Sequence, residues 1–423
     1  MNITQNHPIL QEHIAQISNH ISKDPLIGSL LRPEDLEHFL ASGLSKLLAA
    51  ALDKERQFHL QNFPEDRANG MAPKRSFHIG TTALDIERPR TRNGFYPAFL
   101  PKYQRHLPQS YQDLLSDILL QAKSFKAALL TMQNLGLSYC PNQLEELLQE
   151  IEQEAKAFFS RPLAADWLFL FADAKIIDLK DEHNQVKKAI HFLIIGISME
   201  GRKELLLSST IWGTEVLEAW RKVLVDLKNR GLARVLHLVT DDFSGLTGLI
   251  KGLFPFSDHQ LCTVHLFRNA HRHLDSDDYQ LFRQSWQEIV ASSGYESASS
   301  KLQVLLESLK PNNKSWVEHL EKRTDHYLAF MKYPNALRRH IHSTNLPEGL
   351  NNQIETMRRN AGGHFHSQRE AIIKIKLLSD RLHQTRWKNP NPNIKSQLFV
   401  LNQIFGNRFE TELNSLSFLT QNS

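Results

Sequence analysis

The chain has 423 residues, of which 41% are hydrophobic and 23% charged, an ordinary composition for a folded protein that excludes wholesale disorder. No apolar run approaches the roughly 18 to 20 residues that a bilayer span needs, and the first residues lack the apolar stretch of a secretory signal. Two cysteines, Cys140 and Cys262, are too few for a disulfide framework or a four-cysteine zinc site. We therefore expect a cytoplasmic protein with no membrane partner.

The net charge of +4 is small, but the charges are unevenly distributed. Residues 88–106 contain five Lys or Arg and no acid, and residues 332–388 contain eleven Lys or Arg against four acids. Residues 145–154 between them hold five glutamates. Two basic blocks favour a polyanion contacted at two places, although a scattered solvated surface explains the charge pattern equally well.

The first part of the chain predicts a helix, a linker and an extended arm. Residues 33–56 carry apolar side chains at helical spacing, whereas residues 62–78 contain prolines and a glycine among polar residues and indicate a linker. Prolines and a glycine also exclude a long helix after residue 88. Five cations in this arm are interleaved with aromatic rings, a composition suited to phosphates; they are Arg88, Arg90, Arg92, Lys102 and Arg105. The alternative is an ordinary surface loop with its aromatic rings in the core.

Residues 110–135 show two short periodic helices, and a third helix is expected after Cys140 and Pro141. Three short helices with tight turns are typical of a helix-turn-helix module. The third helix is rich in glutamate, however, which is the wrong charge for a helix that lies in a DNA groove.

From residue 161 the pattern changes to strands. Apolar runs predict strands at residues 167–172, 189–197, 205–211, 234–240 and 259–262, with helices at 214–230 and 244–253 after the third and fourth strands. Residues 266–339 are predicted to be entirely helical. This order of elements indicates an α/β fold with a helical insertion.

Two acids stand at predicted strand ends. Asp173 follows the first strand, and Asp241 follows the fourth. If these strands are neighbours, the two carboxylates face each other, and oxygen ligands at such a site favour Mg²⁺ or Mn²⁺. Each acid taken singly is better explained as a cap of the following turn or helix; together, in this strand order, they favour metal binding.

A third acid for two metal ions must come from outside the sheet, and Glu348 is the best candidate. Thr344 or Asn345 is expected to cap the helix that carries it. Its polar stripe is followed by basic residues that we expect to contact DNA backbone, namely Arg358, Arg359, Lys374 and Lys376.

Together these residues resemble the Mutator-type DDE transposases of bacterial insertion sequences. The resemblance covers residues 80 to 380, and its motifs are weak singly but specific in this order. They are Pro89-Arg-x-Arg-x-Gly-x-Tyr-Pro-x-x-Leu-Pro-Lys-Tyr-Gln-Arg105, Arg161-Pro-Leu163, Asp173, Asn229-Arg-Gly231, Val239-Thr-Asp241, Ser244-Gly-Leu246, Gln260-Leu-Cys-Thr-Val-His-Leu-Phe-Arg-Asn269, Thr344-Asn-x-x-Glu348 and Gly363-x-Phe365.

The resemblance implies a ribonuclease H-like mixed sheet with an all-helical insertion, preceded by an α-helical DNA-binding region. The family's catalytic, metal-binding acids fall on Asp173, Asp241 and Glu348, and its Cys-x-x-His falls on Cys262 and His265, which are expected beside the acids. Expected cofactors are two Mg²⁺ or Mn²⁺ ions. Expected partners are double-stranded DNA, as terminal inverted repeats and target, and a second copy of the chain in a homodimer or larger assembly at the nucleoid.

The expected domains are a helical region at 1–62, an arm and helix-turn-helix-like domain at 63–160, a catalytic domain at 161–400 with its insertion at about 266–340, and a tail at 401–423. The expected reaction is two-metal cleavage of the insertion-sequence ends, after which the 3′-hydroxyl attacks target DNA.

Several alternatives remain from the sequence alone. The enzyme could be a structure-specific nuclease of the same fold that does not rejoin strands, or the chain could be a non-catalytic DNA-binding descendant. Asp242 competes with Asp241, and Glu355 competes with Glu348; the family's residue order and the position in the first helical turn favour Asp241 and Glu348. Cys262 and His265 could instead join His271 or His273 in a zinc site.

Overall fold

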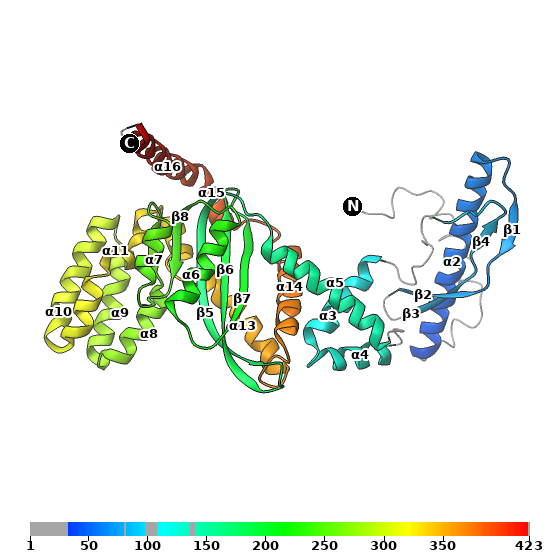
Figure 1. The fold of residues 1–423 in the computed structure, drawn as a ribbon, viewed down its shortest axis with the longest axis horizontal. Helices are drawn as coiled ribbons and strands as arrows, with labels where there is room; N and C mark the ends of the chain where they lie inside the picture. Colours follow the sequence, from blue (N-terminus) through cyan, green and yellow to red (C-terminus); the bar gives the residue numbers. More distant parts are fainter. Residues whose placement is uncertain (1–32, 80–81, 98–107, 136–139, 422–423) are drawn as a thin grey trace. The chain divides into compact units, whose positions relative to one another are not determined.

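The structure is a computed structural model that describes residues 33–79, 82–97, 108–135 and 140–421. The chain divides into two compact units (Figure 1). The smaller unit contains residues 1–119 and 126–144, and the larger contains residues 120–125 and 145–423. No helix in the described part of the chain is long and apolar enough to cross a membrane.

The smaller unit is built on one long helix and two antiparallel strand pairs. Its elements are α2 (Pro33–Asn62), β1 (Ala68–Met71), β2 (Arg75–Ile79), β3 (Thr82–Ile86) and β4 (Pro89–Thr91), with β1 paired to β4 and β2 to β3. Leu52 of α2 packs with Leu84 and Ile86 of β3 in a small core. The expectation of a linker at 62–78 is therefore wrong, because hairpin pairing orders this polar segment.

Three helices follow, as the sequence predicts: α3 (Pro108–Gln121), α4 (Phe125–Asn134) and α5 (Pro141–Ser160). They do not belong to one unit, since α5 from Glu145 onward groups with the larger unit. There Arg369 forms ion pairs with Glu145 at 2.8 Å and with Glu152 at 2.6 Å. Two of the glutamates that made α5 unsuitable as a DNA reader thus hold it to the larger unit, and the compact unit begins before the predicted boundary at residue 161.

The larger unit contains a five-stranded mixed sheet in the order β7-β6-β5-β8-β9. Its strands are β5 (Asp166–Lys180), β6 (Val186–Ser198), β7 (Lys203–Trp212), β8 (Arg234–Thr240) and β9 (Asp258–Leu261). The first and fourth predicted strands, β5 and β8, are indeed neighbours and run parallel. β6 is antiparallel to both β5 and β7, whereas β9 is parallel to β8.

Helices cover both faces of this sheet (Figure 1). On one face, α6 (Leu217–Asn229) and α7 (Leu246–Leu253) pack against side chains such as Leu170 and Leu238. On the other, Phe169, Phe171 and Val239 join a core with the helical region that follows β9. The elements of this region are α8 (Thr263–His273), α9 (Ser276–Val290), α10 (Tyr295–Glu321), α11 (Thr324–Tyr327), the 3₁₀ helix η3 (Ala329–Lys332) and α12 (Asn335–Ile341).

The chain ends with α13 (Asn345–Asn360), α14 (Gln368–Gln384), α15 (Pro392–Ser396) and α16 (Leu398–Gln421). Three apolar side chains of α16 belong to the same core as Phe169 and Phe171; they are Leu401, Phe405 and Phe409. Arg408 of the same helix pairs with Asp258 at the start of β9, at 2.7 Å. The start of the predicted tail at residue 401 is therefore part of the main core, because α16 buries one apolar face there.

Candidate active site

Asp173 lies inside a strand rather than at its end, which corrects the expectation from sequence. β5 continues to Lys180 because β6 pairs with it along its whole length, Asp173 opposite Leu193. On its other side, however, the pairing with β8 stops at Phe171. Side chains alternate along a strand, so Asp173 points to the same face as Phe169 and Phe171. It is therefore a buried acid, 6% exposed, just beyond the end of the parallel pairing.

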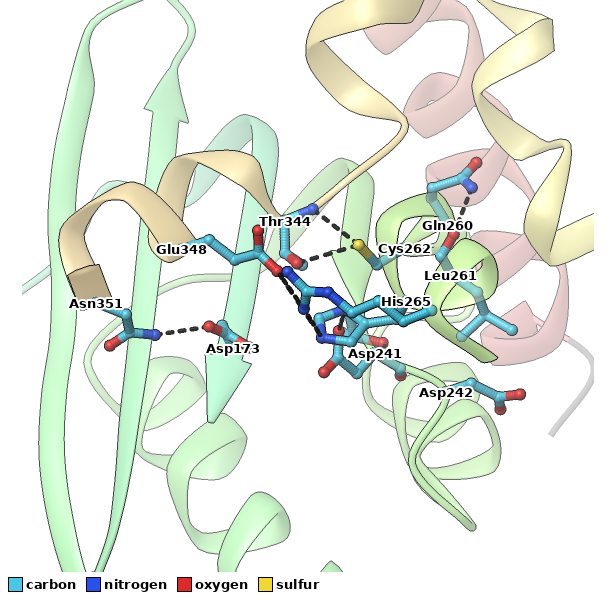
Figure 2. A network of polar contacts seen from close by, with 12 residues as sticks. Asp173, Asp241, Asp242, Gln260, Leu261, Cys262, His265, Thr344, Glu348 and Asn351 are labelled. Atoms are coloured by element: carbon cyan, nitrogen blue, oxygen red, sulfur yellow. Dashed lines mark hydrogen bonds and ion pairs between the residues drawn. The ribbon is translucent and has the colours of Figure 1, made fainter. Parts of the chain in front are cut away.

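Asp241 directly follows β8, as expected. It comes two residues after Val239, whose side chain packs on the same face of the sheet as Phe171. This register brings Asp241 near Asp173, because β5 and β8 are adjacent and parallel. Figure 2 shows both carboxylates at one place beside the sheet.

Glu348 lies in the first turn of α13, where its backbone N–H donates to the carbonyl of Thr344 at 2.9 Å. Thr344 occupies the N-cap position, but its hydroxyl makes no capping hydrogen bond. The Thr344 hydroxyl and backbone N–H instead donate to the Cys262 sulfur, at 3.2 and 3.3 Å. This buried contact joins the start of α13 to the segment between β9 and α8, and so positions Glu348 beside the sheet (Figure 2).

Asn351, one helical turn after Glu348, is a site residue that the sequence analysis missed. Its amide donates to Asp173 Oδ2 at 2.6 Å, and both side chains are buried. The spacing of three residues on one helix was the available signal, since residues three apart share a face. Asn351 thereby gives the buried carboxylate a direct donor.

Two cations of α8 lie among the acids. His265 Nδ1 forms an ion pair with Asp241 Oδ1, and His265 Nε2 lies 3.8 Å from Glu348 Oε1. Arg268, which the sequence analysis also missed as a site residue, donates to Glu348 Oε1 at 3.1 Å. Residues 265 and 268 are one turn apart, so α8 presents both cations to the carboxylates.

The competing acids lie elsewhere. Asp242 points away from Asp173 and Glu348 (Figure 2), and it binds His319 at 2.8 Å and Arg323 at 2.9 Å. Glu355 binds Arg358 at 2.7 Å and Arg359 at 3.0 Å. Of each two competing acids, the one that lies near Asp173 is therefore Asp241 rather than Asp242, and Glu348 rather than Glu355.

The electrostatics of the site reflect burial first and the neighbouring charges second. Burial, followed by the charges of Asp241 and Glu348, raises the pKa of Asp173 to about 7, despite the hydrogen bond from Asn351. Burial alone would lower the pKa of His265, but its contacts with Asp241 and Cys262 raise this pKa to about 10. The negative charge of the cluster therefore favours a cation among these groups.

A fourth carboxylate, Glu215, lies near the cluster and was not predicted. It accepts a hydrogen bond from the indole N–H of Trp220 at 2.7 Å. Burial and the charge of Asp241 raise the pKa of Glu215. No local pattern marks this residue, because it is simply the acid before a helix.

The donor set fits a hard divalent cation. Asp173, Asp241 and Glu348 offer carboxylate oxygens, the ligands that Mg²⁺ and Mn²⁺ prefer. Ligand atoms of Asp241, Cys262 and His265 also lie within 4.8 Å of one another. The Cys262 sulfur is already an acceptor for Thr344, and His265 is paired with Asp241, so we favour the carboxylates as ligands. The zinc site left open by the sequence gains no support, because His271 and His273 do not belong to this group of ligand atoms.

The predicted DNA-binding cations differ in their exposure and in the contacts that they already make within the protein. Arg90 and Arg92 are exposed, flanking the buried Thr91 at the end of β4, and Arg88 stacks on the ring of Tyr96 at 4.3 Å. Lys102 and Arg105 lie outside the described residues.

The cations after Glu348 are mostly engaged. Arg359 is exposed, whereas Arg358 is largely buried and pairs with Glu355 and Asp178. Lys374 is fully buried and donates to the carbonyl of Ala122, so the expectation that it contacts DNA is wrong. Lys376 pairs with Asp380 at 2.5 Å.

Comparisons of the sequence with known proteins indicate one family. Residues 12–389 match the family described as Transposase, Mutator family. A transposase for insertion sequence element IS905 of Lactococcus lactis is 27% identical over 78% of this chain and 85% of its own. A transposase for insertion sequence element ISRM3 of Rhizobium meliloti is 27% identical over 85% of this chain and 88% of its own length. The Drosophila P element transposase strand transfer complex aligns with 75% of this chain and 88% of that chain at 11% identity, but its TM-score of 0.28 is too low to establish a shared fold.

Proposed function

The chain belongs to the Mutator family of transposases, and on that premise we propose that it is an active DDE transposase that cuts the ends of an insertion sequence and joins the freed 3′-hydroxyl to target DNA. One observation carries this proposal. Carboxylates from β5, from the end of β8 and from the start of α13 meet at one place, although 175 residues separate Asp173 from Glu348 along the chain. Such a cluster of like charges around the buried Asp173 is costly unless cations neutralise it.

We assign the fold of the larger unit to the ribonuclease H-like class. The support is the strand order β7-β6-β5-β8-β9 with β6 antiparallel to its neighbours. This order makes β5 and β8 adjacent and brings their acids to one face. The helical region between β9 and α13 then corresponds to the proposed insertion.

Asp173, Asp241 and Glu348 would hold two Mg²⁺ or Mn²⁺ ions, which when bound activate the attacking oxygen and stabilise the leaving 3′ oxygen. Asn351 holds the Asp173 carboxylate in a fixed orientation through its 2.6 Å hydrogen bond. His265 and Arg268 keep Asp241 and Glu348 in place by ion pairing. Cys262 fixes the start of α13 through Thr344 and so acts on position rather than on the reacting atoms.

The DNA would be contacted by the arm at Arg88, Arg90, Arg92, Lys102 and Arg105, and by Arg359. Arg358 is a weaker candidate because two acids already bind it. Two ends must be cut and joined in a coordinated way, so the working form would be a dimer or larger assembly. This activity would take place at the nucleoid in the cytoplasm.

A cleavage assay with matched variants tests the assignment. The substrate is a labelled duplex that contains the inverted repeat found in the DNA beside the gene. We expect Asp241→Ala and Glu348→Ala each to reduce Mg²⁺-dependent cleavage by orders of magnitude. Asp242→Ala and Glu355→Ala are the matched controls, one neighbouring in sequence and one on the same helix, and should stay within about tenfold of the unaltered protein.

The cleavage assay tests the assignment of each acid separately. If Asp242→Ala or Glu355→Ala abolishes cleavage while its partner variant cleaves normally, the assignment of that acid is wrong. A second, unlabelled duplex in the same reaction distinguishes a transposase from a nuclease of the same fold. Only a transposase joins the labelled end to the second duplex, and cleavage without any joined product would contradict the proposed function.

A further inference from the structure

A cavity of about 920 Å³ lies in the helical region next to the acids. Its wall is formed by α8, α9, η3 and α12. Arg268 belongs to this wall and also donates to Glu348 at 3.1 Å. The cavity therefore adjoins the candidate active site, and we call it the α8–α9 pocket.

Aromatic rings form much of the pocket. Phe267 and Trp286 stand at right angles with their ring centroids 6.0 Å apart, and Tyr279 and Phe330 complete the aromatic surface. Trp286 and Phe330 are almost fully buried and form the floor of the pocket, whereas Phe267 and Tyr279 are half-buried and expose ring surface to it. The volume is in the range of about 300 to 1,000 Å³ that is usual for small-molecule sites.

The polar part of the lining is cationic. None of the pocket's lining residues, all of them in the described part of the chain, is acidic. The buried guanidinium of Arg338 is used structurally, because it donates to backbone carbonyls including those of Ser292 and Tyr333. Arg272 and Arg339 are exposed at the rim, and among the described residues neither has a carboxylate partner.

Flat rings inside and cationic arginines at the rim suit a nucleotide, whose base stacks on aromatic rings and whose phosphates attract arginine. A purely apolar ligand would gain nothing from the arginines, and a cationic ligand would be repelled. We propose that the α8–α9 pocket receives one base of the DNA end, turned out of the duplex beside the phosphate that is cut. This inference rests on the proposed function, since it concerns the same DNA substrate.

The stacked base would fix the position of the adjacent backbone relative to the acids, with Arg268 between the pocket and Glu348. Arg272 and Arg339 would hold the flanking phosphates. Unpairing a base costs free energy, and stacking in the pocket would offset that cost.

Photocrosslinking tests the proposal directly. End duplexes carrying 5-iodouracil at successive positions around the cleavage site are bound to full-length Asp173→Asn protein, which is expected to bind DNA without cutting it. After irradiation, the linked residue is mapped by mass spectrometry. We expect one position to link to Phe267 or Tyr279, the two rings that expose surface to the pocket, and the positions on either side of it to give little product.

Cleavage kinetics give a second readout that does not depend on altering the core. Ala291→Trp places a bulky ring at the exposed edge of the pocket, and Arg272→Ala with Arg339→Ala removes the rim charges. Each should slow cleavage roughly five- to hundredfold, the range expected for the loss of one base–aromatic stack. Arg221→Ala is the control, because Arg221 is an exposed arginine of α6 outside the pocket, and it should stay within about twofold.

The results separate the two proposals. If the duplexes are bound and cut normally but no position links to the pocket, or if the rim and Ala291 variants cut like the control, the pocket assignment is overturned and the proposed function stands. If the unaltered protein neither binds nor cuts any end duplex, the proposed function fails and this inference fails with it.

Discussion

Replacing Asp173 by Asn should stabilise the metal-free protein and at the same time abolish its activity. Burial and the charges of Asp241 and Glu348 raise the pKa of Asp173 from 3.8 to about 7, so its ionised form is unfavourable in the folded protein. Asn has nearly the same shape, can accept the hydrogen bond from Asn351, and carries no charge. The variant therefore removes the repulsion while leaving the packing intact.

The size of the effect follows from the shift. Each pKa unit corresponds to about 1.4 kcal/mol, so a rise from 3.8 to about 7 corresponds to a loss of at most about 4 kcal/mol when Asp173 ionises. Because the pKa of Asp173 is higher in the folded protein than in the unfolded chain, Asp173 costs no stability below about pH 4. The unaltered protein then loses stability as the pH rises through about 7 and the buried carboxyl ionises. The Asn variant has no such loss, so its advantage should be small near pH 4 and largest near pH 8.

Thermal melts followed by tryptophan fluorescence measure this difference. In EDTA at pH 8, we expect the larger unit of the Asn variant to melt roughly 5 to 10 °C above the unaltered protein, and the gap to shrink steadily toward pH 5. Mg²⁺ should raise the melting temperature of the unaltered protein and leave that of the variant nearly unchanged. Asp242→Asn is the control, and it should be destabilising throughout this pH range because it loses its pairing with His319 and Arg323.

Two results would refute this reasoning. A difference between variant and unaltered protein that does not change with pH would mean that Asp173 is not an ionisable group strained by its neighbours. Appreciable Mg²⁺-dependent nicking of end DNA by the purified Asn variant, with end binding intact, would mean that Asp173 is not needed for the chemistry.

Other changes have equally definite expected outcomes. Arg90→Ala with Arg92→Ala should weaken end binding and reduce the log–log salt slope by about 0.9 for each phosphate that is no longer neutralised; an unchanged slope in a salt titration would remove these residues from the interface. Asn351→Ala should raise the Mg²⁺ concentration needed for half-maximal cleavage several-fold, because the buried aspartate loses its direct donor. Gly196→Ala should destabilise by about 1 to 3 kcal/mol in melts, since the new Cβ would lie 2.6 Å from a tryptophan ring, whereas the open helical site at Gly248 should tolerate Ala.

Local sequence patterns predicted most of the secondary structure and the two acids of the candidate site that β5 and β8 carry. Apolar runs and helical periodicity are local signals, and they placed β8 at its observed residues and predicted the four described helices before the five-stranded sheet, α2 to α5. The condition under which Asp173 and Asp241 would face each other, that β5 and β8 are neighbours, holds in the structure. The full length of β5 was not predicted. β5 runs past Asp173 because β6 pairs with it, and the residues of β5 alone carry no signal for pairing with another segment.

Which side chains meet depends on how distant segments pack in the folded protein. Asn351 and Asp173 are 178 residues apart, and their hydrogen bond exists because α13 crosses the sheet face to which alternate residues of β5 point. From sequence, the glutamates of α5 have the wrong charge for a helix in a DNA groove. In the structure, two of them, Glu145 and Glu152, pair with Arg369. Charge, burial and periodicity can be read along the chain, but the partner of a charge depends on strand register and helix packing, which the folded chain alone establishes.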